Sequence, residues 1–429
     1  MRIVYLAAGA GGMYCGMCLS SNALVAAMRR LGADAMLLPA YTPLRTDEDD
    51  VSLPQMAFGG LNVFLQEKSA LFRHTPRLLD WLLDRPGLLR LVGRLSTSTR
   101  PQDLGPLTVS MLRGEQGRQR KELVKLVELL EELRPDVIHL STVLLAGAAG
   151  ELVRRLGVPV VATLAGEELF VDRLPSPHRE AARAELRRHA AELTAMVAMN
   201  RFTADFMADY LNVARERIEV IPAGIQFEGF PHDATIPAAG SRGTPFTLGY
   251  FARIAPEKGL HVAAEALKHL AAEATLPPVR LRAGGYLGRA EGPYLEAITG
   301  ELAGLTDRFE YAGEVDRPGK IALLASFDVM ALPTTHPESK GLPVLEAWAA
   351  GTPVIVPATG TFPEMIDSCG GGLLVPPDDP VALAAAVRRL VADRRLAAEL
   401  GRQGRAALER HHGVELAAER TVALYERLR

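Results

Sequence analysis

The stretch "TTHPESKGLPVLEAWAAGTPVIVPATGTFPEMI", residues 334–366, decides the expected fold. A buried strand is expected to end near Thr334, and a polar loop follows it. Pro343 suits the first position of a helix, where its missing N–H leaves no hydrogen bond unmade. That helix is expected to stop at Gly351, before the apolar run "TPVIVP". A strand, a loop, a helix and a second strand in this order predict a parallel sheet covered by helices.

Similar units are predicted along nearly the whole chain. Continuous apolar runs rich in Val, Ile and Leu alternate with amphipathic helical patterns, as in doubly wound α/β proteins. The runs fall into two series, so we expect two Rossmann-like domains. The first series is RIVYL, AMLLP, DVIHLS, PVVATL, AMVAM and IEVIPAG, and the second is FTLGYFA, VRLRAGG, FEYAG, DVMALPT, TPVIVPA and GGLLVPP.

The segment 224–245 is rich in Gly, Pro and Ala and predicts the boundary between the two domains. We expect an N-terminal domain over residues 1–225, a C-terminal domain over 226–413 and an amphipathic helix at about 414–429. Residues of about 41–120 interrupt the first series and predict a helical insertion. This insertion either covers the core or forms a lid that contacts an acceptor or a membrane surface.

Composition excludes some classes of protein. The 429 residues are 48% hydrophobic and 23% charged, as in a globular protein with a large core, and the net charge of −3 gives no sign of nucleic-acid binding. Basic residues do cluster at Arg113, Arg118, Arg120 and Lys121, as a solvated helix face or a functional patch.

No apolar run has the length of a membrane span, and no signal peptide is expected. The three cysteines fit a reduced, cytoplasmic protein.

The start of the helix in the opening stretch carries the first candidate site. Gly341 and Leu342 stand where free backbone N–H groups and the positive helix end can hold a phosphate group. Glu338 precedes this helix end, and Glu346 lies one turn inside it. Their carboxylates can accept hydrogen bonds from sugar or ribose hydroxyls. The alternative is that both glutamates are structural residues that face solvent.

Cations for a phosphate are predicted on a second unit of the same kind, "GYFARIAPEKGLHVAAEAL", residues 249–267. Arg253 and Lys258 flank Pro256 directly before the expected helix. Both side chains could reach a diphosphate, and neutralising a departing diphosphate lowers the barrier to its loss. The alternative is that they are two ordinary basic residues of the surface.

Together these motifs resemble the retaining GT-B glycosyltransferases of family 4. Their hallmark, E-x-x-G-x-P-x-x-E-A-x-A-x-G-x-P-V, is present from Glu338 to Val354. The family's R-x-x-x-x-K-G is present from Arg253 to Gly259, and its G-x-x-P-E from Gly360 to Glu364. The resemblance covers nearly the whole chain and is strongest over residues 245–385.

The resemblance implies the GT-B fold, an α/β fold with two Rossmann-like domains that face a central cleft. It implies that the C-terminal domain holds a nucleotide diphosphate sugar, while the N-terminal domain takes the acceptor. By this resemblance Arg253 and Lys258 bind the diphosphate, Glu346 binds the ribose hydroxyls and Glu338 binds the donor sugar. Arg253, Lys258 and Glu338 are therefore the expected catalytic residues. The last helix is expected to cross back to the first domain.

Family members retain the anomeric configuration and need neither a cofactor nor a metal-binding D-x-D motif. The only such motif here, Asp47 to Asp49, is expected to be a solvated loop. The resemblance therefore implies a metal-independent hexosyltransferase, with a role such as polysaccharide biosynthesis. It places the chain in the cytoplasm or at the inner face of the membrane.

Two positions depart from the family pattern, and a third matches it but has a structural alternative. Many relatives have T-x-H-G in the first domain, but Ala165 stands where their histidine approaches the donor sugar. Ala165 can neither donate nor accept through its side chain, so Glu167 or Glu168 replaces the histidine, another segment does, or catalysis is impaired. The family's G-[IV]-D is also changed, to Gln226 at its last position. His139 matches a family position that faces the cleft, although a structural histidine is an equal alternative.

The N-terminal loop "AGAGGMYCGMCLS", residues 8–20, lacks both G-x-G-x-x-G and the P-loop motif. In the family that the chain resembles, a Gly-Gly loop after the first strand approaches the donor, and Gly11 and Gly12 match it. Cys15 and Cys18 are expected one turn apart on the first helix. With no second cysteine pair, a metal or redox site is not expected there.

The leading hypothesis is a transferase that moves a sugar from a nucleotide diphosphate sugar to a glycan, a lipid-linked acceptor or a small molecule. One alternative is an epimerase or hydrolase of nucleotide sugars. Another is a weakly active protein that binds sugar nucleotides, which the alanine at position 165 favours. The sequence predicts neither the base, the sugar and the acceptor nor the oligomeric state.

Overall fold

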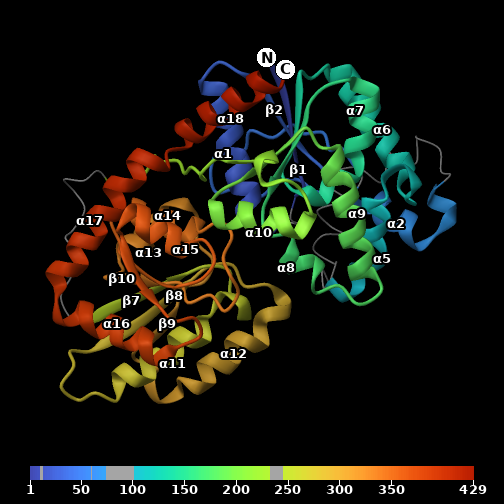
Figure 1. The fold of residues 1–429 in the computed structure, drawn as a ribbon. Helices are drawn as coiled ribbons and strands as arrows, with labels where there is room; N and C mark the ends of the chain where they lie inside the picture. Colours follow the sequence, from blue (N-terminus) through green and yellow to red (C-terminus); the bar gives the residue numbers. More distant parts are fainter. Residues whose placement is uncertain (10–12, 59, 74–100, 232–244) are drawn as a thin grey trace. The chain divides into compact units, whose positions relative to one another are not determined.

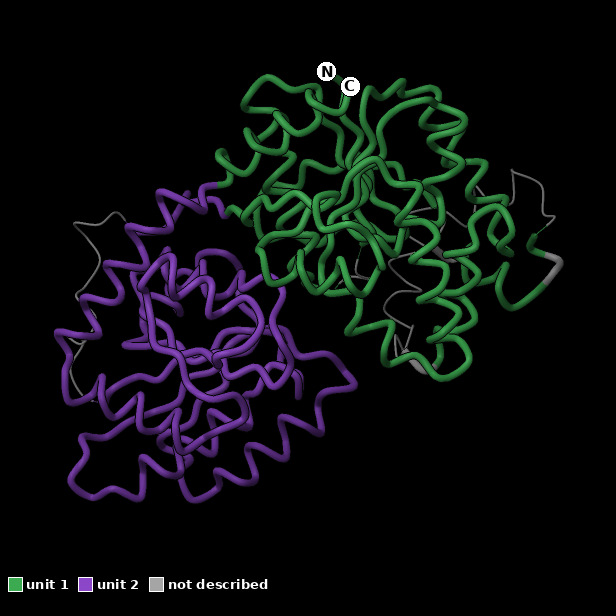
Figure 2. The backbone as a smooth tube through the Cα atoms, in the orientation of Figure 1, with its two compact units in different colours: residues 1–224, 414–429 green, residues 225–413 purple. Residues whose placement is uncertain are grey.

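The structure is a computed structural model that describes residues 1–9, 13–58, 60–73, 101–231 and 245–429. The chain divides into two compact units (Figure 2). Unit 1 contains Met1–Gly224 and Val414–Arg429, and unit 2 contains Ile225–Gly413. Each unit is built around its own parallel sheet, so each is described separately.

Unit 1 has a six-stranded sheet with the order β2-β1-β3-β4-β5-β6, and every pairing is parallel. Each apolar run of the first predicted series overlaps one of its strands, and β1 and β2 each extend one residue beyond their run. The bounds are β1 Arg2–Ala7, β2 Asp34–Pro39, β3 Val137–Leu140, β4 Val160–Leu164, β5 Ala195–Ala198 and β6 Ile218–Val220.

Alternate residues of β1 show why these runs are continuously apolar. Val4 and Leu6 belong to the hydrophobic core on one face of the sheet, whereas Ile3 and Tyr5 belong to the core on the other face. Since both faces are buried, no position of the strand can be polar without a partner. The helices on the two faces are α1 Gly16–Arg30, α2 Gly60–Lys68, α5 Pro101–Leu112, α6 Arg120–Leu133, α7 Ala149–Leu156, α8 Glu168–Val171, α9 His178–Glu192, α10 Arg201–Leu211 and α18 Val414–Leu428 (Figure 1).

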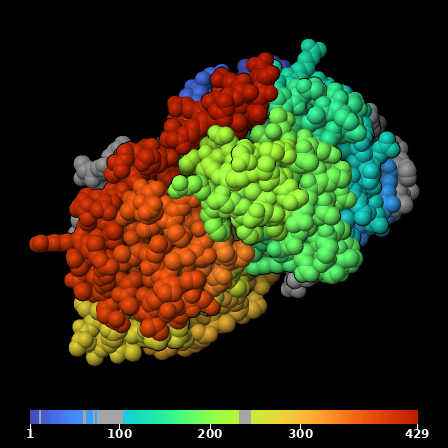
Figure 3. All heavy atoms as spheres, in the orientation of Figure 1, coloured from blue at the N-terminus to red at the C-terminus, as the bar shows by residue number. Residues whose placement is uncertain are grey.

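The last helix of the chain belongs to unit 1. α18 packs against α1, and its buried face carries Val414, Ala418 and Tyr425. Its opposite face remains at the surface (Figure 3, deepest red). The first and last helices of the chain therefore cover one face of the same sheet.

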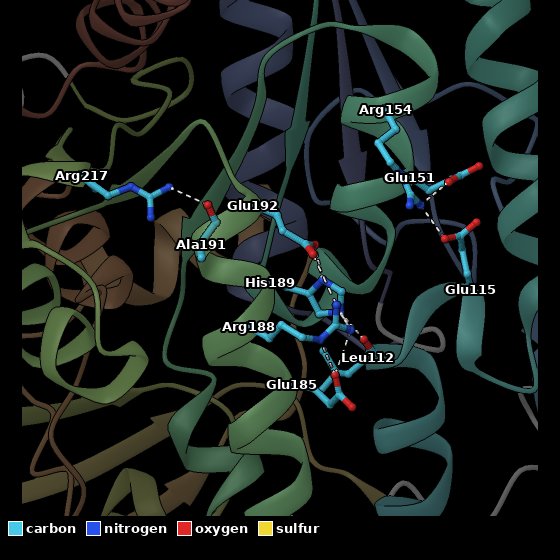
Figure 4. Close-up of polar contacts among 10 residues, drawn as sticks. All are labelled: Leu112, Glu115, Glu151, Arg154, Glu185, Arg188, His189, Ala191, Glu192 and Arg217. Carbon is cyan, nitrogen blue, oxygen red and sulfur yellow. Dashed lines mark hydrogen bonds and ion pairs between the residues drawn. The ribbon is translucent and has the colours of Figure 1, made fainter.

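The predicted insertion at 41–120 is described only in part. It contains α2 and α5, while the apolar segment 75–95 lies outside the described residues. α5 is fixed to α9 by His189, which is 3% exposed (Figure 4). The His189 Nε2 atom lies 2.6 Å from the Leu112 carbonyl oxygen at the end of α5, and Nδ1 lies 2.6 Å from Glu192 Oε2. The described end of the insertion is thus part of the unit 1 fold.

Unit 2 repeats the architecture with the strand order β12-β11-β10-β7-β8-β9, again parallel throughout. Each run of the second predicted series contains one of its strands. The strands are β7 Phe246–Phe251, β8 Val279–Gly284, β9 Phe309–Tyr311, β10 Val329–Ala331, β11 Val354–Pro357 and β12 Gly372–Val375. The helices are α11 Leu260–Ala271, α12 Gly292–Glu301, α13 Arg317–Ala325, α14 Leu342–Ala349, α15 Phe362–Cys369, α16 Pro380–Ala392 and α17 Arg394–His411. In the described part of the chain, no helix is both long enough and apolar enough to cross a membrane.

Candidate functional site

The candidate site of unit 2 lies at the carboxyl ends of three neighbouring strands. β11, β10 and β7 are adjacent in the sheet, so the loops that follow them emerge at the same edge. The loop after β7 carries Arg253 and Lys258, and the loop after β10 carries Glu338. The sheet order therefore brings together residues that are 80 positions apart in the sequence.

Glu338 and Lys258 form the central ion pair of this edge. The Lys258 Nζ atom lies 2.5 Å from Glu338 Oε2, and the Lys340 backbone N–H donates to Oε1 at 3.2 Å. The Glu338 residue is 7% exposed, whereas the Lys258 side chain is 23% exposed. Burial by itself raises the pKa of Glu338, but the charges of Lys258 and Lys340 and these hydrogen bonds lower it to about 2. The carboxylate is therefore charged at neutral pH.

Two glycines allow the chain to approach itself closely at this pair. Gly259 has φ +78°, and a Cβ atom there would lie 1.8 Å from the Pro333 carbonyl oxygen. Gly360 has φ +63°, and a Cβ atom there would lie 2.4 Å from the Glu338 backbone nitrogen. Both the backbone conformation and the space exclude a side chain. These contacts explain why the K-G and G-x-x-P-E motifs contain glycine.

Helix α14 begins one residue before Pro343, the residue that the sequence predicted as its first. Gly341 is its N-cap residue, with no side-chain cap, Leu342 is its first residue, and Pro343 lies in the first turn. The first backbone N–H groups of a helix have no partner within the helix, so this end can bind an anion. The helix ends at Ala349, followed by Gly351 at φ +70°.

Glu346 on α14 has a partner that the sequence did not indicate. The Lys320 Nζ atom lies 2.6 Å from Glu346 Oε1. Lys320 is on α13 and is 5% exposed, and the Glu346 side chain is 16% exposed. Each of the two predicted glutamates is thus paired with one lysine. Glu346 does not simply face solvent.

Arg253 lies on the β7 loop as expected and has an acidic neighbour. Its Nη2 atom lies 2.5 Å from Glu257 Oε1, and its side chain is 41% exposed. The Glu257 carbonyl oxygen accepts a hydrogen bond from the Thr335 backbone N–H at 3.2 Å, which joins the β7 loop to the β10 loop. Glu257 is a second residue that the motif comparison did not single out.

In unit 1, the structure favours the structural alternative for His139. The residue is 1% exposed, and its ring stacks on Tyr5 with 4.4 Å between centroids. The Tyr425 hydroxyl lies 2.5 Å from Nδ1, and Thr163 Oγ1 lies 2.7 Å from Nε2. Burial lowers the pKa of His139 to about 3, so the ring is neutral at physiological pH. His139 joins the sheet to the last helix of the chain.

Glu167 is likewise part of the fold. It is 4% exposed, and its carboxylate accepts hydrogen bonds from Thr142 Oγ1 at 2.6 Å, from the Val143 backbone N–H at 3.2 Å and from the Ala165 backbone N–H at 2.8 Å. The carboxylate therefore fixes the loops after β3 and β4. This arrangement gives Glu167 a structural role beside Ala165.

The remaining sequence predictions are placed as follows. Gly11 and Gly12 lie outside the described residues. The backbone of the Asp47 to Asp49 loop is bound to α1, because Asn22 Nδ2 donates to the Asp49 carbonyl oxygen at 2.9 Å. Cys15 is the N-cap residue of α1 rather than part of the helix, Cys18 is buried in its first turn, and neither forms a disulfide. In the basic cluster, Arg118 pairs with Glu67 and Arg113 with Glu185.

Two family models match the chain. The model described as "Glycosyl transferases group 1" matches residues 232–407, and the one described as "Glycosyltransferase Family 4" matches residues 93–228. The chain is 32% identical over 327 residues to the 2-deoxystreptamine glucosyltransferase of Streptomyces kanamyceticus, covering 71% of this chain and 81% of the relative. It is 32% identical over 301 residues to the D-inositol 3-phosphate glycosyltransferase of Xylanimonas cellulosilytica, covering 66% and 70%.

Solved structures share the fold. Sucrose-phosphate synthase from Thermosynechococcus elongatus superimposes with a TM-score of 0.71 at 19% identity, covering 100% of this chain and 99% of that one. The Anabaena protein HepE, in complex with UDP, gives a TM-score of 0.67 at 18% identity over the whole of both chains. Together with the two parallel sheets, these similarities confirm the α/β GT-B fold with two Rossmann-like domains.

Proposed function

The chain belongs to glycosyltransferase family 4, the group 1 glycosyl transferases, and we propose that it moves a sugar from a nucleoside diphosphate donor to an acceptor hydroxyl with retention of configuration. In this proposal unit 2 binds the donor and unit 1 binds the acceptor. Sugar transfer is the activity of the family, whereas the donor, the retention and the acceptor are our proposals.

The observation that carries the proposal is the Glu338–Lys258 pair. The buried carboxylate is charged at neutral pH, so it can accept hydrogen bonds from hydroxyls of the donor sugar. Lys258 is partly exposed, so its ammonium group can exchange one negative partner for another as the diphosphate arrives. With Arg253 on the same loop, it would neutralise the charge that develops on the leaving diphosphate. Arg253, Lys258 and Glu338 are the proposed catalytic residues.

The remaining donor contacts follow from the start of α14. The backbone N–H groups at Gly341 and Leu342 would bind phosphate oxygens, and the Glu346 carboxylate would accept from the ribose hydroxyls. We propose that the two cations supply the charge compensation for which other enzymes use a metal, so that neither a metal nor a cofactor is needed. We place the enzyme in the cytoplasm, in keeping with its sparse cysteines.

Comparisons guide the choice of substrates for a test. HepE structures contain UDP and UDP-glucose, and two relatives are named for 2-deoxystreptamine and D-inositol 3-phosphate. UDP-glucose is therefore the first donor to test, followed by GDP- and ADP-sugars. The two polyhydroxylated rings are the first acceptors.

The test measures release of nucleoside diphosphate by the wild type and by Glu338→Ala, with and without acceptor. We expect release that depends on the acceptor and that Glu338→Ala lowers at least 100-fold, since the variant loses a charged contact to the reacting sugar. Glu399→Gln, at an exposed ion pair of α17, is the control and should keep full activity. NMR of the product should show the anomeric configuration of the donor.

Other outcomes would overturn the proposal. Free sugar released equally with and without acceptor indicates a hydrolase, and an isomerised nucleotide sugar indicates an epimerase. Binding of a nucleotide sugar without any release supports a second candidate function, a weakly active binding protein. The observation behind this second candidate is Ala165, whose neighbour Glu167 accepts three hydrogen bonds from the fold.

A further inference from the structure

The proposed function gives no role to the buried Lys320 on α13. Its ammonium group lies 2.6 Å from Glu346, the residue proposed to bind the ribose. We propose that Lys320 is a positioning residue, which holds one oxygen of the Glu346 carboxylate so that the other can accept from the ribose hydroxyls of the donor nucleotide. This inference rests on the proposed function.

The location of Lys320 is unfavourable for a lysine with a purely structural role. It lies in the fourth position of α13, near the positive end of the helix, where a cation is disfavoured. It is also 5% exposed, and lysine is almost never buried without a partner. Leu323 and Leu324, one turn further along α13, are buried and apolar. An apolar residue at position 320 would continue that face, so the ammonium group requires a separate explanation.

The backbone at Lys320 is firmly anchored. Asp316 is the N-cap residue of α13, and its Oδ1 atom accepts from the Gly319 backbone N–H at 2.9 Å. The Lys320 backbone N–H donates to the Asp316 carbonyl oxygen at 2.7 Å. The Glu346 backbone is similarly fixed on α14, between buried Leu345 and Ala347. Both partners of the ion pair therefore project from rigid helices that pack against each other.

The geometry of the pair leaves one carboxylate oxygen available. Lys320 binds Oε1 of Glu346, while Oε2 has no hydrogen-bond partner in the part of the chain that the structure describes. The Glu346 side chain is 16% exposed, so a ligand can reach it. A carboxylate oxygen can accept two hydrogen bonds, which matches the two neighbouring hydroxyls of a ribose.

Lys320 differs from Lys258 in what it can reach. The Lys258 side chain is 23% exposed and can turn to a ligand, whereas the Lys320 side chain is 6% exposed. We therefore expect Lys320 to act on the nucleotide only through Glu346. Its loss should change the recognition of ribose and leave the binding of the diphosphate and the base nearly unchanged.

The experiment compares two ligands that differ only in the ribose hydroxyls. Dissociation constants are measured by calorimetry for UDP and 2′,3′-dideoxy-UDP, and for the GDP and ADP pairs if UDP gives no thermal shift. The ratio of the two constants is the ribose preference. We expect Lys320→Met to lower this preference at least tenfold while the affinity for the dideoxy ligand changes less than threefold. Lys320→Arg, which keeps the charge, should retain a larger part of the preference.

Matched variants separate positioning from general destabilisation. Lys268→Met removes a partly exposed lysine of α11 that pairs with Glu265 and Glu301, and it should leave the preference unchanged. Loss of a buried charge can impair folding, so Lys320→Gln is made in parallel. The double variant Lys320→Met with Glu346→Gln buries no uncompensated charge. It should show the same ribose preference as Glu346→Gln alone, because Lys320 acts only through Glu346.

Two negative results have different meanings. If Glu346→Gln keeps the full ribose preference, the ribose contact of the proposed function is wrong, and the role of Lys320 falls with it. If Glu346→Gln loses the preference while Lys320→Met and Lys320→Gln both keep it, only the inference about Lys320 is overturned. A double variant with a lower preference than Glu346→Gln alone would also contradict it, since Lys320 would then act by another route.

Discussion

Both units bury ionisable side chains near the carboxyl ends of their parallel strands, but they compensate them in different ways. In unit 1, His139 is neutral and lies between hydroxyl groups, and the Glu167 carboxylate is bound by one hydroxyl and two backbone N–H groups. In unit 2, Glu338 and Glu346 are each compensated by a lysine. Neutral donors therefore bind His139 and Glu167, whereas lysines bind Glu338 and Glu346.

This difference distinguishes a carboxylate that stabilises the fold from a carboxylate whose partner can bind a ligand. Hydrogen bonds from backbone N–H groups are fixed by the chain, so Glu167 cannot leave its partners without disturbing two loops. A lysine with a partly exposed ammonium group can exchange its carboxylate for a phosphate, as we propose for Lys258. A buried carboxylate at a strand end is therefore a candidate for function when its partner is a partly exposed cation.

The largest predicted effect is the overall loss of stability of unit 1 in acid. Burial lowers the pKa of His139 from 6.5 in the unfolded chain to about 3, so below pH 6.5 the unfolded chain binds a proton that the folded chain does not. The His139 contribution to stability is full above pH 6.5; about 5 kcal/mol is lost once the pH falls below 3, and about 2 kcal/mol of this is lost between pH 7 and 5. Glu338 has its pKa lowered from 4.5 to about 2, so its contribution is lost only below pH 4.5.

Urea unfolding at pH 7 and pH 5 checks this prediction with two probes. Far-UV circular dichroism follows the whole chain, and in a Trp81→Phe background the emission of buried Trp348 follows unit 2. The unit 1 transition should move to lower urea at pH 5, while the Trp348 transition should not. In His139→Gln the shift should disappear. If unit 1 of the wild type unfolds at the same urea concentration at both pH values, the His139 ring is not held in its neutral form by burial.

The second prediction concerns the close approach that positions Lys258. Gly259→Ala would place a Cβ atom 1.8 Å from the Pro333 carbonyl oxygen at φ +78°, and we expect a loss of about 4 kcal/mol in the unfolding free energy of unit 2. Gly157→Ala in unit 1 is the matched control, since Gly157 has φ +66° with no atom within 4 Å of the added Cβ. Only the backbone conformation then opposes alanine, and we expect about 1 kcal/mol.

Urea unfolding followed by Trp348 emission measures the first variant, and circular dichroism measures the second. Equal losses in the two variants would show that the contact with Pro333 relaxes freely. The close approach of Gly259 to Pro333 would then add nothing to the unfolding free energy of unit 2 beyond the effect of the backbone conformation.

The sequence predicted the parts of the fold that are encoded locally. Continuous apolar runs such as "PVVATL" mark the strands. A parallel strand that is buried on both faces is apolar at nearly every position, so it stands out in the sequence. The start of α14 could be predicted to within one residue, because glycine, proline and the expected strand lie close together in the sequence. The motif from Arg253 to Gly259 could also be recognised, because all of its residues lie in one short stretch of the sequence.

Contacts between distant segments could not be predicted. Tyr425 and His139 are 286 residues apart, and no pattern in either segment indicates that they meet. Lys320 occupies an ordinary position in an amphipathic helix, 26 residues before its partner Glu346. One weak signal was present, because Lys320 follows the N-cap Asp316 by four residues, at a helix end that disfavours cations. The predicted role of Glu167 was unsettled because two of its three donors, at Thr142 and Val143, come from a distant loop.

The smallest predicted effect tests whether Glu167 belongs to the architecture. Glu167→Ala leaves one hydroxyl and two backbone N–H groups of unit 1 without their acceptor, at Thr142, Val143 and Ala165. Each lost hydrogen bond in a buried site costs about 1 kcal/mol, so we expect unit 1 to lose about 3 kcal/mol of unfolding free energy. The control is Glu131→Ala on α6, where the Glu131 carboxylate pairs with Arg155 at 2.6 Å and the side chain is 39% exposed. Its loss should stay within about 0.5 kcal/mol, because exposed ion pairs contribute little. If both variants unfold at the same urea concentration as the wild type, the carboxylate of Glu167 is dispensable to the fold, and a direct part in binding the substrate becomes the better explanation for its place beside Ala165.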